Sequence, residues 1–295
     1  MTDLRTTTGE NVRASLLDGL PVTERRLELA EISTPVLDGG TGPDVVLLHD
    51  PAEYAAKWLR VIPDLVQSHR VIAPDLPGHG ESLVGDGPLD ADRVLSWLGE
   101  LIDRTCSAPP TVVGLILGGG IAARFAVDHG ERIRRLVLVD SLGLQPLAPT
   151  PEFGQALTGY FVEPSAATHD LLWEQCAVDL GRLRSAMGER WESFAAYNVE
   201  RMQTPAVQAA LQALMHHFGQ PAIPAEDLAR ITVPTTLIWG RHDRATSVDV
   251  AREASARYGW PLHVIEDCAD DPAMEQPEAF LEALHAALGT GDSAE

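Results

Sequence analysis

Apolar and polar positions alternate along the chain in two ways. Short, continuous apolar runs are typical of strands buried on both faces of a sheet, and stretches with helical spacing separate them. This alternation predicts an α/β fold with a doubly wound, mostly parallel sheet. The apolar runs are residues 45–48, 71–74, 112–115, 136–139, 236–239 and 262–265, and the helical stretches are residues 54–66, 90–105, 121–129, 248–258 and 277–288.

The alternation stops in the block of residues 143–228. No strand-like run occurs there, and helical patterns are repeatedly broken by proline. We therefore predict a helical cap at 143–228, inserted after the sixth strand of a core that comprises residues 1–142 and 229–295.

The N-terminal part of the chain has a weaker pattern. Residues 27–32 alternate with period two, which predicts a strand at a sheet edge. Residues 1–22 are polar enough to predict a loose arm with one short helical piece.

A strand, a very tight turn and a helix are predicted around Ile116. Gly114 and Gly118 flank this residue and allow the turn to close without a clash of Cβ atoms. A catalytic elbow has this frame and carries a nucleophile at its centre. Here the central residue is Ile116, whose side chain has no atom that can attack.

Composition excludes several classes of partner. The formal net charge of −21 disfavours nucleic acid and anionic membranes. Three widely spaced cysteines form neither a disulfide framework nor a metal motif, which favours a reducing cytoplasm, and the polar N-terminus indicates no signal peptide. We predict no metal, no cofactor, no membrane span, and a monomer or homodimer. The single lysine, Lys57, is interpreted as coding bias.

Five local motifs together resemble the α/β-hydrolase family, in its branch with a helical cap. The resemblance covers about residues 25 to 290 and implies an oxyanion loop, a nucleophile elbow, an acid and a catalytic histidine. The motifs lie at residues 45–49, 75–82, 114–119, 239–243 and 275–280.

Four positions depart from what the resemblance implies. Ile116 stands in place of the nucleophile, and Asp270 stands in place of the histidine, with Asp271 as its alternative if the register slips by one. Asp50 replaces a glycine of the oxyanion loop, and Pro51 removes one backbone N–H donor. The backbone N–H of Leu117 remains as a donor.

The remaining acids predict acid–base chemistry. We expect Asp243, at the position of the family acid, to lie close to Asp270, so that one of the two pKa values rises. Asp50 is predicted to join them as the third catalytic residue. The alternatives are an ion pair of Asp243 with Arg241 or Arg244, and a helix-capping role for Asp270.

An apolar pocket is predicted over the elbow, with cap aromatics as its roof. These aromatic residues could equally form the core of the cap itself, and His49 could simply pack behind the oxyanion loop. The predicted substrate-binding residues are Ile116, Leu115, Leu117, Pro51, His49, Tyr160 and Trp173.

Three functions follow as hypotheses. The first is a non-hydrolytic acid–base enzyme of bacterial secondary metabolism that acts on a mostly apolar small molecule. Its reaction is a cyclisation, an elimination or a rearrangement. The second is an inactive relative that binds a small molecule or a partner protein. The third is an atypical ester or lactone hydrolase in which an aspartate activates water.

Overall fold

Nine strands form one sheet in the computed structural model, which describes residues 12–289. Their order is β1-β2-β4-β3-β6-β7-β8-β9, and β5 pairs with β2. The strands are β1 (Thr23–Leu29), β2 (Ile32–Gly39), β3 (Asp44–Leu48), β4 (Arg70–Pro74), β5 (Leu83–Val84), β6 (Thr111–Leu115), β7 (Arg135–Val139), β8 (Thr235–Gly240) and β9 (Leu262–Ile265).

The strands from β4 to β9 along this order pair in parallel, and β2 joins them antiparallel. The predicted mostly parallel α/β sheet is therefore confirmed. The edge strand predicted at 27–32 is wrong in its bounds, because Ala30 and Glu31 form a turn at positive φ that separates β1 from β2. Apolar and polar residues continue to alternate across this turn, and the pattern was therefore interpreted as one strand.

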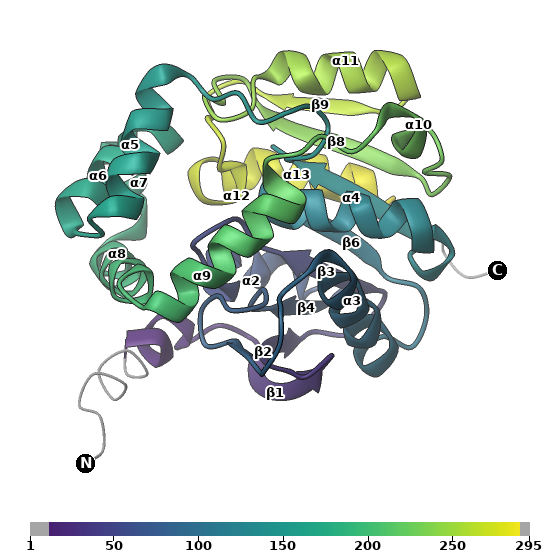
Figure 1. Ribbon diagram of the computed structural model, residues 1–295, viewed down its shortest axis with the longest axis horizontal. Coiled ribbons are helices and arrows are strands. Elements are labelled where there is room, and N and C mark those ends of the chain that lie inside the picture. Colours follow the sequence, from purple (N-terminus) through teal and green to yellow (C-terminus); the bar gives the residue numbers. More distant parts are fainter. Residues whose placement is uncertain (1–11, 290–295) are drawn as a thin grey trace.

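Helices connect the strands and cover the sheet (Figure 1). The helix predicted at 54–66 is in fact two short pieces, because Pro63 supplies no N–H at the start of the second. The helices of the core are η1 (Ala55–Trp58), α2 (Ile62–Leu65), α3 (Ala91–Thr105), α4 (Leu117–His129), η2 (Gly130–Arg132), α11 (Val248–Tyr258), α12 (Pro272–Glu275) and α13 (Pro277–Leu288).

A run of helices lies between β7 and β8, where the cap was predicted. Counted without the two-residue β5, β7 is the sixth strand. In Figure 1 α5 to α8 form an arc beside the sheet, and α9 leads back to the core. The elements are α5 (Pro151–Val162), α6 (Ala166–Cys176), α7 (Leu180–Met187), α8 (Glu189–Met202), α9 (Pro205–Leu214), the π-helical turn η3 (Met215–Gly219) and α10 (Ala225–Leu228).

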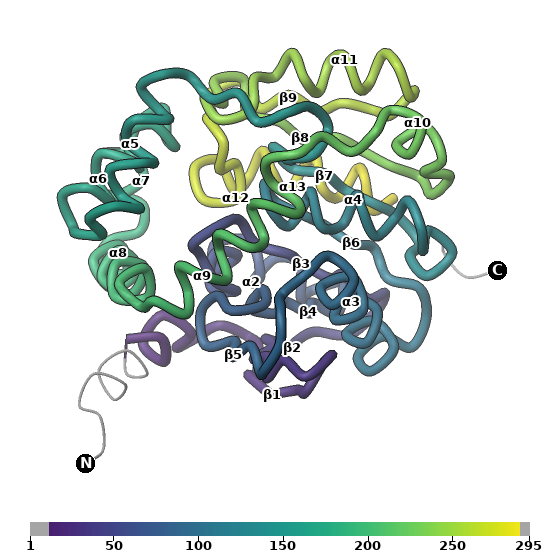
Figure 2. Tube along the Cα trace, viewed as in Figure 1, coloured from purple at the N-terminus to yellow at the C-terminus, as the bar shows by residue number. Residues whose placement is uncertain are grey.

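The segment 12–20 packs against the cap and is not a loose arm. Figure 2 shows it passing beside α8. Leu16 is fully buried in a cluster that includes Trp191 and Phe194 of α8. Arg13 forms a buried ion pair with Asp75, which also accepts hydrogen bonds from the backbone N–H groups of Ala55 and Glu81. The rest of the predicted arm, residues 1–11, lies outside the described residues.

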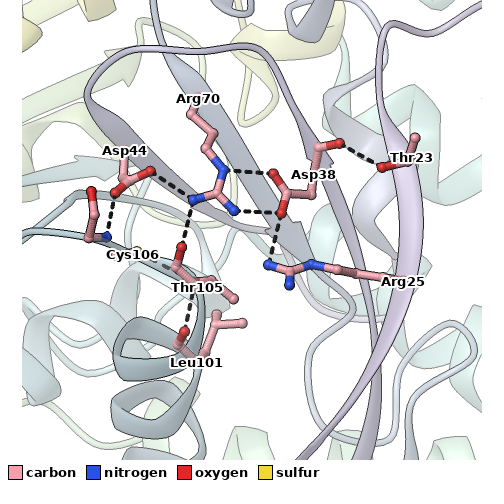
Figure 3. Close-up of polar contacts among 9 residues, drawn as sticks. Thr23, Arg25, Asp38, Asp44, Arg70, Leu101, Thr105 and Cys106 are labelled. Carbon is pink, nitrogen blue, oxygen red and sulfur yellow. Dashed lines mark hydrogen bonds and ion pairs between the residues drawn. The ribbon is translucent and has the colours of Figure 1, made fainter.

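A polar cluster joins strands at the amino ends of β3 and β4 (Figure 3). Arg70 donates to both carboxylate oxygens of Asp38, at 2.9 and 2.7 Å, and to Asp44 at 3.3 Å. It also donates to the carbonyl of Thr105 at the end of α3, at 2.6 Å. Arg25 adds a second ion pair to Asp38, at 2.8 Å. This cluster, the Arg70 cluster, ties β1, β2, β3, β4 and α3 together.

Candidate active site

The turn around Ile116 keeps the geometry of an elbow. Ile116 has φ of 47° and ψ of −101° between β6 and α4. Its backbone is fixed by a bond to the carbonyl of Val139, at 2.9 Å. A Cβ on Gly114 would lie 2.4 Å from the carbonyl oxygen of Gly118, so the turn requires glycine there. Positive φ on a β-branched residue costs about 1–3 kcal/mol, which the surrounding structure sustains.

A cavity of about 80 Å³ opens beside this elbow, between the sheet and the helices α5 and α6. By this measure one water needs roughly 10–15 Å³, so the cavity can hold a small organic molecule. Its apolar lining is Pro51, Ala52, Ile116, Leu142, Leu147, Phe153, Leu157, Leu172, Trp173, Met215 and Ala245, and its polar lining is Asp50, Glu53, Lys57, Tyr160, His169, Cys176, Asp270 and Asp271.

Lys57 is the charged centre of the cavity wall, and sequence analysis missed it. Its Nζ lies 2.6 Å from Asp271, 3.0 Å from Asp50 and 3.8 Å from Glu53, and it stands 4.5 Å from the ring centre of Trp173. Burial lowers the pKa of Lys57, but the three carboxylates outweigh burial and raise it well above its usual value. Lys57 is therefore an ammonium ion. The signal for it was available, because it is the only lysine in the chain.

The carboxyl groups around Lys57 resist ionisation. Burial raises the pKa of Asp50 to about 6, although Lys57 opposes the shift. Burial also raises the pKa of Glu53 well above its usual value. The amide nitrogen of Asn198, from α8, donates to both oxygens of Glu53 at 2.9 Å. We call Lys57, Asp50, Glu53 and Asp271 the Lys57 cluster.

Asp270 is buried at the cavity wall and is 2% exposed. Burial and then the nearby Asp243 raise its pKa well above the usual value. Its Oδ1 has no hydrogen-bond partner within residues 12–289. The predicted alternative of a helix cap is wrong, because Asp271 caps α12 by accepting from the N–H of Met274 at 3.3 Å. Asp271 therefore fills the capping role, and Asp270 does not cap the helix.

Asp243 follows β8 and is held by its own turn. Its Oδ1 accepts from the N–H groups of Ala245 and Thr246, at 2.7 and 2.8 Å. Burial raises its pKa to about 7 in spite of these bonds. The predicted alternative of an arginine partner is wrong. Arg241 binds Glu266 at 2.8 Å, and Arg244 donates to backbone carbonyls at the end of α6.

Asp140 joins Asp243 and Asp270 in a second group of buried acids. Sequence analysis identified the other two acids but not Asp140. It follows β7, and its Oδ1 accepts from the N–H of Gly240 at 2.9 Å. Burial, and then the charge of Asp243, raise its pKa well above the usual value. Its place directly after a buried strand was the available signal, because functional side chains gather at the carboxyl ends of parallel strands.

His49 does not reach the cavity. Its ring accepts from the N–H of Leu76 at 2.8 Å through Nε2, so its Nδ1 donates to the carbonyl of Asp50 at 2.7 Å. Burial, and then His79, lower its pKa well below the usual value, and the ring is neutral. It packs behind the loop, as the alternative interpretation had it.

Residues 45–283 match the sequence model of the Alpha/beta hydrolase family. The chain belongs to that family. It is 30% identical to a 2-hydroxymuconate semialdehyde hydrolase of Pseudomonas sp. strain CF600, over 93% of this chain and 96% of the relative. It is 28% identical to a pimeloyl-[acyl-carrier protein] methyl ester esterase of Aeromonas hydrophila, over 85% and 97% of the two chains.

Solved structures agree with this α/β-hydrolase assignment. A meta-cleavage product hydrolase from Pseudomonas fluorescens IP01 superposes with a TM-score of 0.75 at 25% identity, covering 92% of this chain and 98% of that one. A bacterial membrane phospholipase A superposes with a TM-score of 0.80 at 23% identity, covering 97% and 92%. The second likeness supports the fold alone.

The predicted site residues of this α/β-hydrolase divide into two groups. The structure brings Asp50, Pro51, Ile116, Asp270, Tyr160 and Trp173 to the cavity surface, and it leaves Asp243, His49, Leu115 and Leu117 behind that surface. Leu115 and Leu117 are fully buried because the elbow turns only the residue between them outward. The four positions where the sequence was expected to depart from the family pattern all line this one cavity.

The described residues contain neither a metal cluster nor a membrane-spanning helix. Between residues 12 and 289 no three His, Cys, Asp or Glu side chains are arranged to hold a metal ion. Nor does any helix in that range have the length and apolar character to cross a membrane.

Proposed function

We propose that this α/β-hydrolase-fold chain is a non-hydrolytic acid–base enzyme acting on a mostly apolar small molecule. In this proposal Asp270 and Asp243 share a proton and Ile116 is a wall of the pocket. The reaction class is a cyclisation, elimination or rearrangement, in which a proton leaves one atom of the substrate and another atom receives one.

The observation that carries the proposal is the position of Asp270. Its carboxyl lies in the cavity wall with one unpartnered oxygen, and no ion pair to it is found among the described residues. Because Asp243 next to it has a pKa raised to about 7, the pair can both give and accept a proton near neutral pH. The side chain of Ile116 offers no atom for a covalent intermediate.

Substitution of each acid tests the proposal. We expect Asp270→Asn and Asp243→Asn each to lower turnover of the true substrate at least tenfold, since general acid–base groups typically contribute about 10²–10⁴-fold. Asp103→Asn is the matched control, because Asp103 is a surface residue paired with Arg132. Candidate substrates come from native mass spectrometry of protein purified from its host. Wild-type turnover in both acid variants would refute the proposal.

A hydrolase that uses Asp270 to activate water is the second candidate. The relatives' names favour it, since they describe an ester esterase and a semialdehyde hydrolase. A panel of aryl esters tests it, with the double variant Ile116→Ser/Asp270→His as a restored control. Hydrolysis by the wild type that Asp270→Asn removes would support this candidate over the first.

A ligand-binding protein without turnover is the remaining outcome. A molecule retained through purification and unchanged on incubation would support it. We further propose that the protein works in the cytoplasm as a monomer or homodimer on a small molecule, because its three cysteines are free and its charge of −21 disfavours nucleic acid.

A further inference from the structure

We propose that the substrate is an amine, and that its ammonium group binds between Asp50 and Asp270 while its apolar part lies against Ile116 and the cap. This inference rests on the proposed function and names the substrate class of the same site. Its support is the balance of charge and of hydrogen-bond donors in the cavity wall.

The acidic and basic groups of the cavity wall are unequal in number. Four carboxyl groups line it, from Asp50, Glu53, Asp270 and Asp271, against the single ammonium of Lys57. That ammonium is already held by Asp271 and Asp50, at 2.6 and 3.0 Å. A cationic ligand would balance the excess of acid, whereas an anionic ligand would add to it.

The neighbouring histidine supplies no positive charge. Burial lowers the pKa of His169 to about 4, so its imidazole is neutral at pH 7. It is 1% exposed, and neither ring nitrogen has a hydrogen-bond partner within the described range. Its Nδ1 stands 4.0 Å from Asp170, which is beyond hydrogen-bond distance. The neutral ring therefore offers one acceptor nitrogen and one N–H donor, and both lack a partner.

Unpartnered oxygen atoms from three separate parts of the chain meet at the same cavity. Asp50 Oδ1, Asp270 Oδ1 and the hydroxyl of Tyr160 have no partner among residues 12–289, and each belongs to a buried side chain. A buried polar group without a partner costs free energy, so such a set is matched to a ligand that donates. An ammonium donates up to three hydrogen bonds, whereas an alcohol donates one.

Binding an amine would also set the protonation state for catalysis. A positive charge next to Asp270 and Asp50 favours their ionised forms and lowers both pKa values. Asp270 would then release its proton to the solvent and change from an acid to a base when the substrate arrives. The substrate itself would prepare the group that takes its proton.

Calorimetric titration at pH 7 with ligands of matched shape tests the inference. The probes are 2-phenylethylamine, 2-phenylethanol and 3-phenylpropanoate, and the smaller set butylamine, butanol and butanoate. We expect the amine of at least one set to bind about tenfold more tightly than its alcohol, and neither carboxylate to bind. Amines that bind no more tightly than the alcohols in both sets would overturn the inference, and this comparison needs no variant.

Variants locate the amine. Asp50→Asn and Asp270→Asn keep the shape of the side chain, and each should lower the ratio of amine to alcohol affinity about fivefold or more. Asp103→Asn should leave that ratio unchanged. An unchanged ratio in both cavity variants would place the amine elsewhere and refute the site.

The outcomes separate this inference from the proposed function. Loss of turnover in Asp270→Asn without amine preference would refute the substrate class and keep the acid–base role. Amine preference with full turnover in Asp270→Asn would keep the substrate class and refute that role.

Discussion

The Arg70 cluster and the Lys57 cluster both combine basic side chains with carboxyl groups, but they differ in the ratio of basic to acidic groups. In the Arg70 cluster two arginines meet two aspartates, and both oxygens of Asp38 receive donors from Arg70. Both oxygens of Asp44 are also bonded, by Arg70 and by the N–H of Ser107. In the Lys57 cluster a single ammonium meets three buried carboxyl groups. The first lies at the amino ends of β3 and β4, and the second borders the cavity.

Backbone strain also differs between the two regions: it occurs at the cavity end of the sheet and not in the Arg70 cluster. Five non-glycine residues in the described range have positive φ, and Ala52, Ile116 and Asp140 among them lie at the cavity end. No residue of the Arg70 cluster does. Because its charges are balanced and its backbone is unstrained, the Arg70 cluster is accounted for by its contribution to the stability of the fold. A strained end with excess acid costs stability, which suggests that the cavity is retained for function.

Removal of the Lys57 ammonium should have the largest effect. In Lys57→Met the carboxylates of Asp50 and Asp271 lose their cation in a buried site, which typically costs about 3–5 kcal/mol. Urea unfolding at pH 7 measures this loss. Adding Asp271→Asn, which preserves the cap of α12, should recover part of it. No recovery in the double variant would mean that the loss comes from packing alone.

The acids of the cavity should make stability fall as pH rises. Asp243 keeps its proton up to about pH 7 when folded, but an unfolded aspartate loses it near pH 3.8. Its stabilising contribution is thus complete below pH 3.8 and is lost through about pH 7, at about 1.4 kcal/mol per pH unit for each proton retained.

Unfolding in urea from pH 5 to pH 8 should therefore show a smaller slope in Asp243→Asn than in the wild type. Asp270, whose pKa is also raised, should contribute in the same direction. Equal slopes in the wild type and the double variant Asp243→Asn/Asp270→Asn would contradict the raised pKa values.

Removal of the Arg70 guanidinium should cost less than removal of the Lys57 ammonium. The side chain of Arg70 is 28% exposed, and Arg25 would still pair with Asp38. We expect Arg70→Met to lower the free energy of unfolding by about 1–2 kcal/mol. A loss equal to that of Lys57→Met would remove the distinction between the two clusters.

At the strained elbow, glycine should stabilise the protein more than alanine does, which is the reverse of their order inside a helix. At Ile116, where φ is 47°, glycine should be more stable than alanine by about 1 kcal/mol, because only glycine accepts positive φ without a Cβ clash. At Ala123, inside α4, Ala123→Gly should instead cost about 1 kcal/mol. Thermal unfolding of Ile116→Gly and Ile116→Ala measures the difference, and an alanine variant that is more stable would show that the elbow is relaxed.

Most of the fold could be predicted from the sequence because local patterns carry it. The six buried strands and the helices at 91–105, 248–258 and 277–288 follow from periodicity and caps. The split of 54–66 and the hairpin at 30–31 were missed. The helix at 54–66 was missed as two pieces because the apolar spacing stays helical across Pro63. The hairpin was missed because its turn lies within a period-two pattern.

The site was predictable only in part. Strand ends and motif spacing singled out Asp50, Pro51, Ile116 and Asp270, and these residues do share a cavity. Lys57 and Asp140 were missed although each carried a signal, because neither residue belongs to a spaced motif that would point to its partners. His49 and Asp243 were placed at the surface of the pocket, whereas the structure buries them behind it.

The sequence by itself determined the order of strands and helices along the chain and the glycine frame of the elbow. It also determined that the residue at the centre of the elbow has no attacking atom. The tertiary structure decided which charges meet. Lys57 faces Asp271 across more than two hundred positions of the chain, and Asp271 rather than Asp270 caps α12. Periodicity is local, but ion pairing, burial and pKa depend on neighbours that only the folded chain brings together.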